Sequence, residues 1–148
     1  MTLRKLTASA TLVTLFALPA MAADATGDAA AGEEAFSQCI SCHVVVNGAG
    51  ETLAGRNART GPNLYGVPGA AIGRVEDFRY GDGIVEANEQ GLMWTEENFV
   101  AYVQDPTGWL REATENKRAR GKMSYRVRDE ADAINLYAYL FSLTDGGS

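Results

Sequence analysis

The residues of this chain whose types and spacing could do chemistry together are Cys39-Ile40-Ser41-Cys42-His43. Cys39 and Cys42 are the only cysteines, and one helical turn between them would bring the two thiols close together, with the imidazole of His43 beside them. This spacing suits two thioether bonds to the vinyl groups of a haem, with the histidine as an axial ligand of its iron. The motif therefore predicts one covalently attached haem c.

Other uses of a C-x-x-C pair fit this chain less well. A thioredoxin-like redox pair belongs in a βαβ unit, which the flanking sequence does not offer. A zinc site needs further Cys or His ligands, and the chain has no third cysteine and no second histidine. Chance occurrence is the remaining alternative, and the position of the only histidine directly after Cys42 argues against it.

A haem iron that only carries electrons needs a second axial ligand, and without another histidine the chemistry allows Met, Cys or Tyr, of which Met is the natural candidate. Met1 and Met21 lie in a segment that we expect to be removed. Met93 directly precedes a predicted helix, where an apolar residue usually serves packing. Met123 follows the polar segment Arg120-Gly121-Lys122, where packing does not explain it. We predict Met123 as the sixth ligand.

Length, composition and charge limit the classes of protein to which this chain can belong. The chain has 148 residues, of which 46% are apolar, which is ordinary for one globular domain. A net charge of −6 argues against a nucleic-acid-binding protein, since binding to phosphates needs a basic surplus. Two cysteines also exclude a disulfide framework.

The first 22 residues are typical of a signal peptide. Arg4 and Lys5 make a positive start, residues 6–22 form an uncharged and mostly apolar run, and Ala20-Met21-Ala22 is an A-x-A-like cleavage site. The run has 17 residues, including three Thr, one Ser and one Pro, whereas a membrane span needs about 20 predominantly apolar residues. We predict cleavage after Ala22 and a single exported domain of residues 23–148, with a net charge of −8.

Capping residues and apolar periodicity predict an all-α domain. The expected helices are residues 29–42 after an N-cap at Asp28, a helix from the N-cap Thr95 that stops before Pro106, a short helix with its N-cap at Asp105, and a last helix that follows Asp129 and ends before Gly146. The last helix carries an apolar stripe of Leu136, Tyr139, Leu140 and Leu143. No alternating strand pattern of useful length is present.

The stretch between Val44 and Leu92 holds ten glycines, a composition that would favour disorder were it not interrupted by apolar residues. This pattern predicts turns wrapped around an apolar body, for which the haem is the candidate. A small domain with long loops gains burial by enclosing a porphyrin, so we expect the chain without haem to fold poorly.

Four motifs of this sequence together resemble those of a known family. The motifs are Cys39-Ile40-Ser41-Cys42-His43, Thr60-Gly61-Pro62-Asn63-Leu64-Tyr65-Gly66, Gly91-Leu92-Met93-Trp94 and Gly121-Lys122-Met123. Together they resemble the class I cytochromes c over nearly all of the predicted mature chain, and the likeness is greatest to the larger bacterial cytochromes c2. The combination is far more specific than C-x-x-C-H alone.

The resemblance implies a fold in which the N- and C-terminal helices cross at right angles and the haem lies in a crevice. Gly32 and Phe36 would then meet Leu136 and Tyr139 where the two helices cross.

The resemblance also implies roles for residues around the haem. The carbonyl of Pro62 would accept the Nδ1–H of His43 and so fix its ring. Tyr80 and Trp94 match residues that donate to a buried haem propionate, and Tyr102 matches a tyrosine near the methionine sulfur. For these three aromatic residues, plain core packing is the alternative that the residues alone favour.

One departure from the family concerns charge near the propionates. Ala70 stands where the family usually carries an arginine, and the sequence leaves open whether Arg74 replaces it. Loss of a positive charge there favours the oxidised haem and lowers the reduction potential.

A second departure is a concentrated basic segment. Residues 111–128 carry a net charge of +5 and the rest of the predicted mature chain carries −13. The basic residues of the segment are Arg111, Lys117, Arg118, Arg120, Lys122, Arg126 and Arg128. In the family fold this charge would surround the exposed haem edge near Met123 and steer an anionic partner to it. A solvated basic loop with no docking role is the alternative.

The resemblance implies a periplasmic electron carrier, a monomer that moves electrons from a cytochrome bc1 complex to a photosynthetic reaction centre, a terminal oxidase or a reductase, and does not act as an enzyme. The competing class is a haem enzyme or gas sensor, which needs an open sixth position and usually a distal acid or base. The chain has no spare histidine for that role.

Overall fold

The computed structural model describes residues 25–144, so the predicted signal peptide and Gly146 lie outside the described residues. Its elements are α1 (Ala29–Ala35), the 3₁₀ helix η1 (Phe36–Gln38), β1 (Val45–Val46), β2 (Thr52–Ala54), α2 (Asp82–Glu89), α3 (Glu96–Gln104), α4 (Pro106–Ala113) and α5 (Glu130–Ser142). The domain is mostly helical with little strand, which confirms the predicted fold class. Within residues 25–144 no helix is long and apolar enough to cross a membrane.

The predicted helix starts are confirmed by the capping contacts. Asp28 accepts from the backbone of Ala30 and Ala31, and Thr95, Asp105 and Asp129 each accept a backbone N–H in the first turn of α3, α4 and α5. These side chains satisfy N–H groups that a helix leaves unpaired at its start. Short-range chemistry therefore decides where these four helices begin.

The predicted helix over residues 29–42 is too long. α1 ends at Ala35, and the chain tightens into η1, where Cys39 N donates to the carbonyl of Phe36 at 2.8 Å. Phe36, the first residue of this tighter turn, is buried. Residues 39–42, which were predicted to be helical, form a turn that follows η1.

Two elements in the glycine-rich stretch were not predicted. β1 and β2 form a two-stranded antiparallel hairpin whose strands are too short to show an alternating pattern. α2 starts at Gly81 without a side-chain cap, and Gly83 within it is buried. A Cβ on Gly83 would lie 2.9 Å from the carbonyl oxygen of Arg120, so this glycine permits close packing between α2 and a distant loop. Tertiary contact, and not propensity, supports α2.

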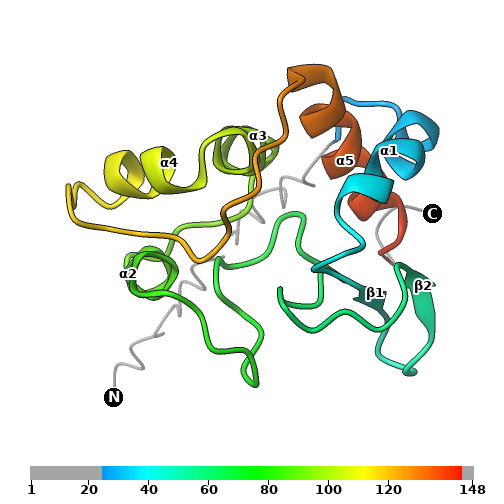
Figure 1. Ribbon diagram of the computed structural model, residues 1–148, viewed down its shortest axis with the longest axis horizontal. Coiled ribbons are helices and arrows are strands. Elements are labelled where there is room, and N and C mark those ends of the chain that lie inside the picture. The colour runs from blue at the N-terminus through cyan, green and yellow to red at the C-terminus, as the bar shows by residue number, and fades with distance from the viewer. Residues whose placement is uncertain (1–24, 145–148) are drawn as a thin grey trace, which may run out of the picture.

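Helices α4, α3, α5 and α1 follow one another across one side of the molecule, and the loops between β2 and α3 cover the other side (Figure 1). α1 packs against α5, as the resemblance implied. A Cβ on Gly32 would stand 2.7 Å from Tyr139 Cβ and closer still to the carbonyl oxygen of Asn135, while the rings of Phe36 and Tyr139 are 5.6 Å apart.

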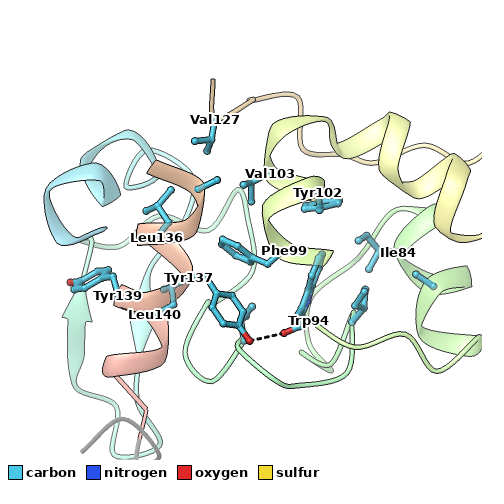
Figure 2. Packing of buried hydrophobic residues seen from close by; sticks show 14 of the residues in the cluster. Ile84, Trp94, Phe99, Tyr102, Val103, Val127, Leu136, Tyr137, Tyr139 and Leu140 are labelled. Carbon is cyan, nitrogen blue, oxygen red and sulfur yellow. Dashed lines mark hydrogen bonds between the residues drawn. The ribbon is translucent and has the colours of Figure 1, made fainter. Parts of the chain in front are cut away.

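Aromatic rings form the core between α3 and α5. The ring of Phe99 lies 5.5 Å from that of Tyr137 and 6.3 Å from that of Trp94. The Tyr137 hydroxyl donates to the Trp94 carbonyl at 3.1 Å (Figure 2). Trp94 meets Tyr102 edge-on at 5.0 Å and stacks on Trp109 at 5.8 Å. The core thus joins the loop before α3 to both helices and forms part of the wall of a cleft.

Candidate functional site

A cleft of about 530 Å³ lies among these elements, within the size range of small-molecule and cofactor sites. The residues that were predicted to hold the cofactor all line it: Cys39, Cys42, His43, Pro62, Tyr80, Trp94, Tyr102 and Met123. Much of the remaining lining is apolar, including Val67, Ile84, Val103, Leu136 and Leu140. The cleft therefore suits a large, flat and mostly apolar group.

The motif residues share one backbone turn. The carbonyl of Cys39 accepts from the backbone N–H of both Cys42, at 3.1 Å, and His43, at 3.0 Å. Two thiols and an imidazole consequently come from the same turn and line the same cleft. This local arrangement matches what two thioether bonds and one axial ligand require.

The ring of His43 is oriented by Pro62. Its Nδ1 lies 2.9 Å from the Pro62 carbonyl oxygen, and because a carbonyl only accepts, Nδ1 carries the proton and Nε2 keeps its lone pair. Burial lowers the pKa of His43, and the bond to Pro62 opposes that shift in part. The imidazole is thus held neutral, in the tautomer that a metal ligand needs.

Gly61 is a further residue of this site, for which no role was expected from the sequence. A Cβ there would stand 2.6 Å from His43 Nδ1 and 2.8 Å from Nε2. Its N–H also donates to the Cys42 carbonyl at 2.7 Å. Gly61 belongs to the motif that contains Pro62. Only the structure shows that Gly61 packs against the imidazole ring of His43.

The alternative uses of the two cysteines are not supported. Burial raises the pKa of the Cys39 thiol to about 11, with a smaller contribution from Cys42, whereas a reactive redox thiol has a lowered pKa. Within residues 25–144 no cluster of three or more His, Cys, Asp or Glu side chains could hold a metal ion. The donor set fits neither a redox dithiol nor a zinc site.

The structure separates the two candidate methionines. Met93 is 42% exposed and does not line the cleft. Met123 is half-buried, packs against the core and lines the same cleft as His43. Of the two methionines, only Met123 shares the cleft with His43.

The three aromatic residues both pack and line the cleft. Trp94 and Tyr102 are buried in the core, and burial raises the pKa of Tyr102 to about 12, so its hydroxyl stays protonated. Tyr80 is half-buried and its hydroxyl accepts from Val75 N at 3.3 Å. Core packing and contact with a bound group are therefore compatible roles for Trp94 and Tyr102.

Arg74, and not Ala70, reaches the cleft. Arg74 lines the cleft and its guanidinium donates to the carbonyl of Tyr65, whereas Ala70 is engaged through its backbone with Trp94. The positive charge of Arg74 also acts on Tyr80, where it partly offsets the increase in pKa that burial causes. One arginine thus stands beside Tyr80 at the edge of the cleft.

The basic side chains near Met123 are exposed, including Lys117, Arg118, Arg120, Lys122 and Arg126. Arg126 pairs with Asp105 at 2.8 Å, an exposed ion pair that contributes little to stability. The structure adds Arg79, which lines a shallow recess together with Arg118, Arg120 and Lys122. Arg79 was missed because it lies far from the basic segment in the sequence.

The long segment before Met123 packs on α2. Asn116 Nδ2 donates to Glu86 Oε2 at 2.8 Å, Gln90 Nε2 donates to the Thr114 carbonyl at 3.2 Å, and Ala119 is buried. These contacts support the loop from which Met123 reaches the cleft.

Comparisons with known proteins agree with this geometry. No protein-family model matches the sequence. Cytochrome c2 of Rhodovulum adriaticum is 61% identical over 120 residues, which cover 81% of this chain and 95% of that protein. Cytochrome c2 of Cereibacter sphaeroides is 53% identical over 134 residues, covering 90% and 91%. The X-ray structure of cytochrome c2 from Rhodobacter sphaeroides superposes with a TM-score of 0.76 at 56% identity, covering 77% of this chain and 94% of that one.

The chain belongs to the cytochrome c2 family. These class I cytochromes are electron carriers and not enzymes, and they carry one covalently bound haem c. The apolar cleft, with Cys39, Cys42 and His43 on a single turn, fits that group. The cofactor and the fold that the sequence predicted are both confirmed.

Proposed function

We propose that this cytochrome is a monomeric periplasmic electron carrier in which His43 and Met123 are the two axial ligands of the haem iron. The observation that carries the proposal is that both side chains line one cleft, with the His43 Nδ1 proton directed to Pro62. The bound haem c supplies one-electron exchange between Fe(II) and Fe(III). The chain's own residues hold the ligands so that little needs to move when an electron arrives or leaves.

The lining of the cleft favours a carrier over an enzyme or gas sensor. Among the described residues that line it there is no carboxylate, and His43 is the single histidine. A peroxidase-like or gas-binding site requires an open sixth position and usually a distal acid or base. The described lining therefore offers no carboxylate and no second histidine for that role, whereas Met123 supplies a thioether.

The visible spectrum tests the axial ligands. Met123→Ala is expected to abolish the weak far-red charge-transfer band that methionine ligation gives to ferric haem, and to let the reduced protein bind carbon monoxide. Met93→Ala is the matched control, because Met93 is exposed and outside the cleft, and it should leave the band unchanged. A band that survives in Met123→Ala would refute the assignment.

We further propose that the exposed basic side chains near Met123 dock a negatively charged membrane redox complex. A bc1-type complex would be the donor, and a photosynthetic reaction centre, a terminal oxidase or a reductase the acceptor. Charge on a small contact face speeds encounter and keeps the complex brief. Electron transfer should therefore slow as ionic strength rises, because salt screens these charges. A rate that is flat or increases with salt would contradict this docking face.

Export is the remaining part of the proposal. The charged start, apolar run and A-x-A-like site of residues 1–22 support cleavage after Ala22. N-terminal sequencing of the protein purified from the periplasm should begin at Ala23. An intact Met1 on the haem-loaded protein would contradict it.

A further inference from the structure

The segment that carries Met123 has few fixed points. Residues 114–129, between α4 and α5, form neither helix nor strand. Within residues 25–144 no backbone N–H of residues 123–126 donates to a backbone carbonyl. On one side Lys122 Nζ donates to the Arg79 carbonyl at 2.7 Å, and on the other Val127 N donates to the Val103 carbonyl at 2.9 Å. The stretch between these points depends on side chains for its position.

Tyr125 lies in that stretch and makes a side-chain hydrogen bond to Gln38. Its hydroxyl donates to Gln38 Oε1 at 2.9 Å, and Gln38 directly precedes Cys39. Both residues line the cleft, so the bond joins its two walls. Among the described residues it is the one side-chain hydrogen bond between residues 122–125 and residues 38–43. Packing alone would hold Tyr125 weakly, because this large side chain is 48% exposed.

The acceptor is itself oriented. Gln38 Nε2 lies 3.5 Å from Asp132 Oδ2 on α5, at the limit of a hydrogen bond. With the amide nitrogen turned to the carboxylate, the amide oxygen is left for the hydroxyl of Tyr125. α5 and η1 thereby present an oriented acceptor to the segment that carries Met123.

We propose that Tyr125 is a positioning residue that fastens the Met123 segment across the mouth of the cleft through Gln38 and so keeps Met123 in place as an iron ligand. This inference rests on the proposed ligation by Met123. Displacement of Met123 requires the segment to lift away, and the bond to Gln38 must break when it does. The bond consequently opposes entry of any external ligand that competes for the same position.

Imidazole, which competes with Met123 for ferric haem iron, is the probe. Tyr125→Phe removes one oxygen and leaves the ring, and Gln38→Leu removes the acceptor. Each variant should raise the apparent imidazole affinity of the haem-loaded ferric protein about fivefold, which corresponds to about 1 kcal/mol, the usual net value of one hydrogen bond. The double variant should show no further increase, because both substitutions break the same bond.

Tyr65→Phe is the matched control, since the Tyr65 hydroxyl makes no hydrogen bond to the described residues and the side chain does not line the cleft. Unchanged affinity in Tyr125→Phe, or effects of the two single variants that add in the double variant, would overturn the proposed tether. The far-red band of the unaltered protein separates the two failures. With the band present, unchanged affinities refute only the role of Tyr125, whereas its absence refutes Met123 ligation and the tether with it.

Discussion

Gly61→Ala is expected to destabilise the haem-loaded protein by placing a methyl group against the imidazole ring of His43. The new Cβ would stand 2.6 Å from His43 Nδ1 and 2.8 Å from Nε2, where ordinary contacts are 3.4–4 Å. To relieve this overlap, the imidazole ring of His43 and the backbone of Gly61 must move apart by about 1 Å. The ring cannot simply withdraw, because its Nδ1 bonds the carbonyl of the next residue, Pro62, at 2.9 Å.

The magnitude follows from these two contacts. Overpacking of this kind costs about 1–3 kcal/mol, and loss or distortion of the bond between His43 and Pro62 adds about 0.5–1.5 kcal/mol. The sum of about 1.5–4.5 kcal/mol should lower the melting temperature of a domain of this size by roughly 10 °C. Backbone strain contributes nothing, since Gly61 does not have a positive φ.

Thermal unfolding followed by circular dichroism measures the effect. Gly48→Ala is the matched control, because a Cβ there meets no atom within 4 Å, and it should melt within a degree or two of the unaltered protein. Equal melting temperatures for Gly61→Ala and Gly48→Ala would refute the reasoning. A change in the visible spectrum of Gly61→Ala alone would place the strain at the His43 ring.

Three other substitutions test the packing of α1 on α5, the charge near the cleft and the organising role of the haem. Gly32→Ala should lower the unfolding free energy by about 1–3 kcal/mol in chemical denaturation, because the methyl group collides with the backbone of Asn135 on α5. Ala70→Arg should raise the midpoint potential by roughly 20 mV in a redox titration, and an unchanged value would show that Arg74 already supplies the charge. A chain with both Cys39→Ala and Cys42→Ala should lose its cooperative melting and helical signal, and retention of both would contradict an organising role for the haem.

Local chemistry explains what could be predicted of the site and fold. The haem motif lies within five consecutive residues, and the helix caps act over two or three residues, so the sequence displays both directly. The sequence favoured Met123 over Met93 as the predicted ligand because Met123 follows a polar segment, and the structure shows that Met123 also packs against the core. The contact between Pro62 and His43 was predicted from the resemblance to the family. The sequence alone could not predict it, because the two residues are 19 positions apart.

Tertiary structure decided the rest, because the deciding contacts join residues far apart in the chain. α2 forms in a glycine-rich stretch since the glycines let it approach Arg120 closely. Arg74 lines the cleft, and Arg79 lies beside the basic segment. Both positions depend on how the loops fold around the cleft. The bond between Tyr125 and Gln38 spans 87 residues. The sequence by itself predicted which groups would bind the haem, while packing determined what surrounds those groups, because local signals act over a few residues and packing acts across the whole chain.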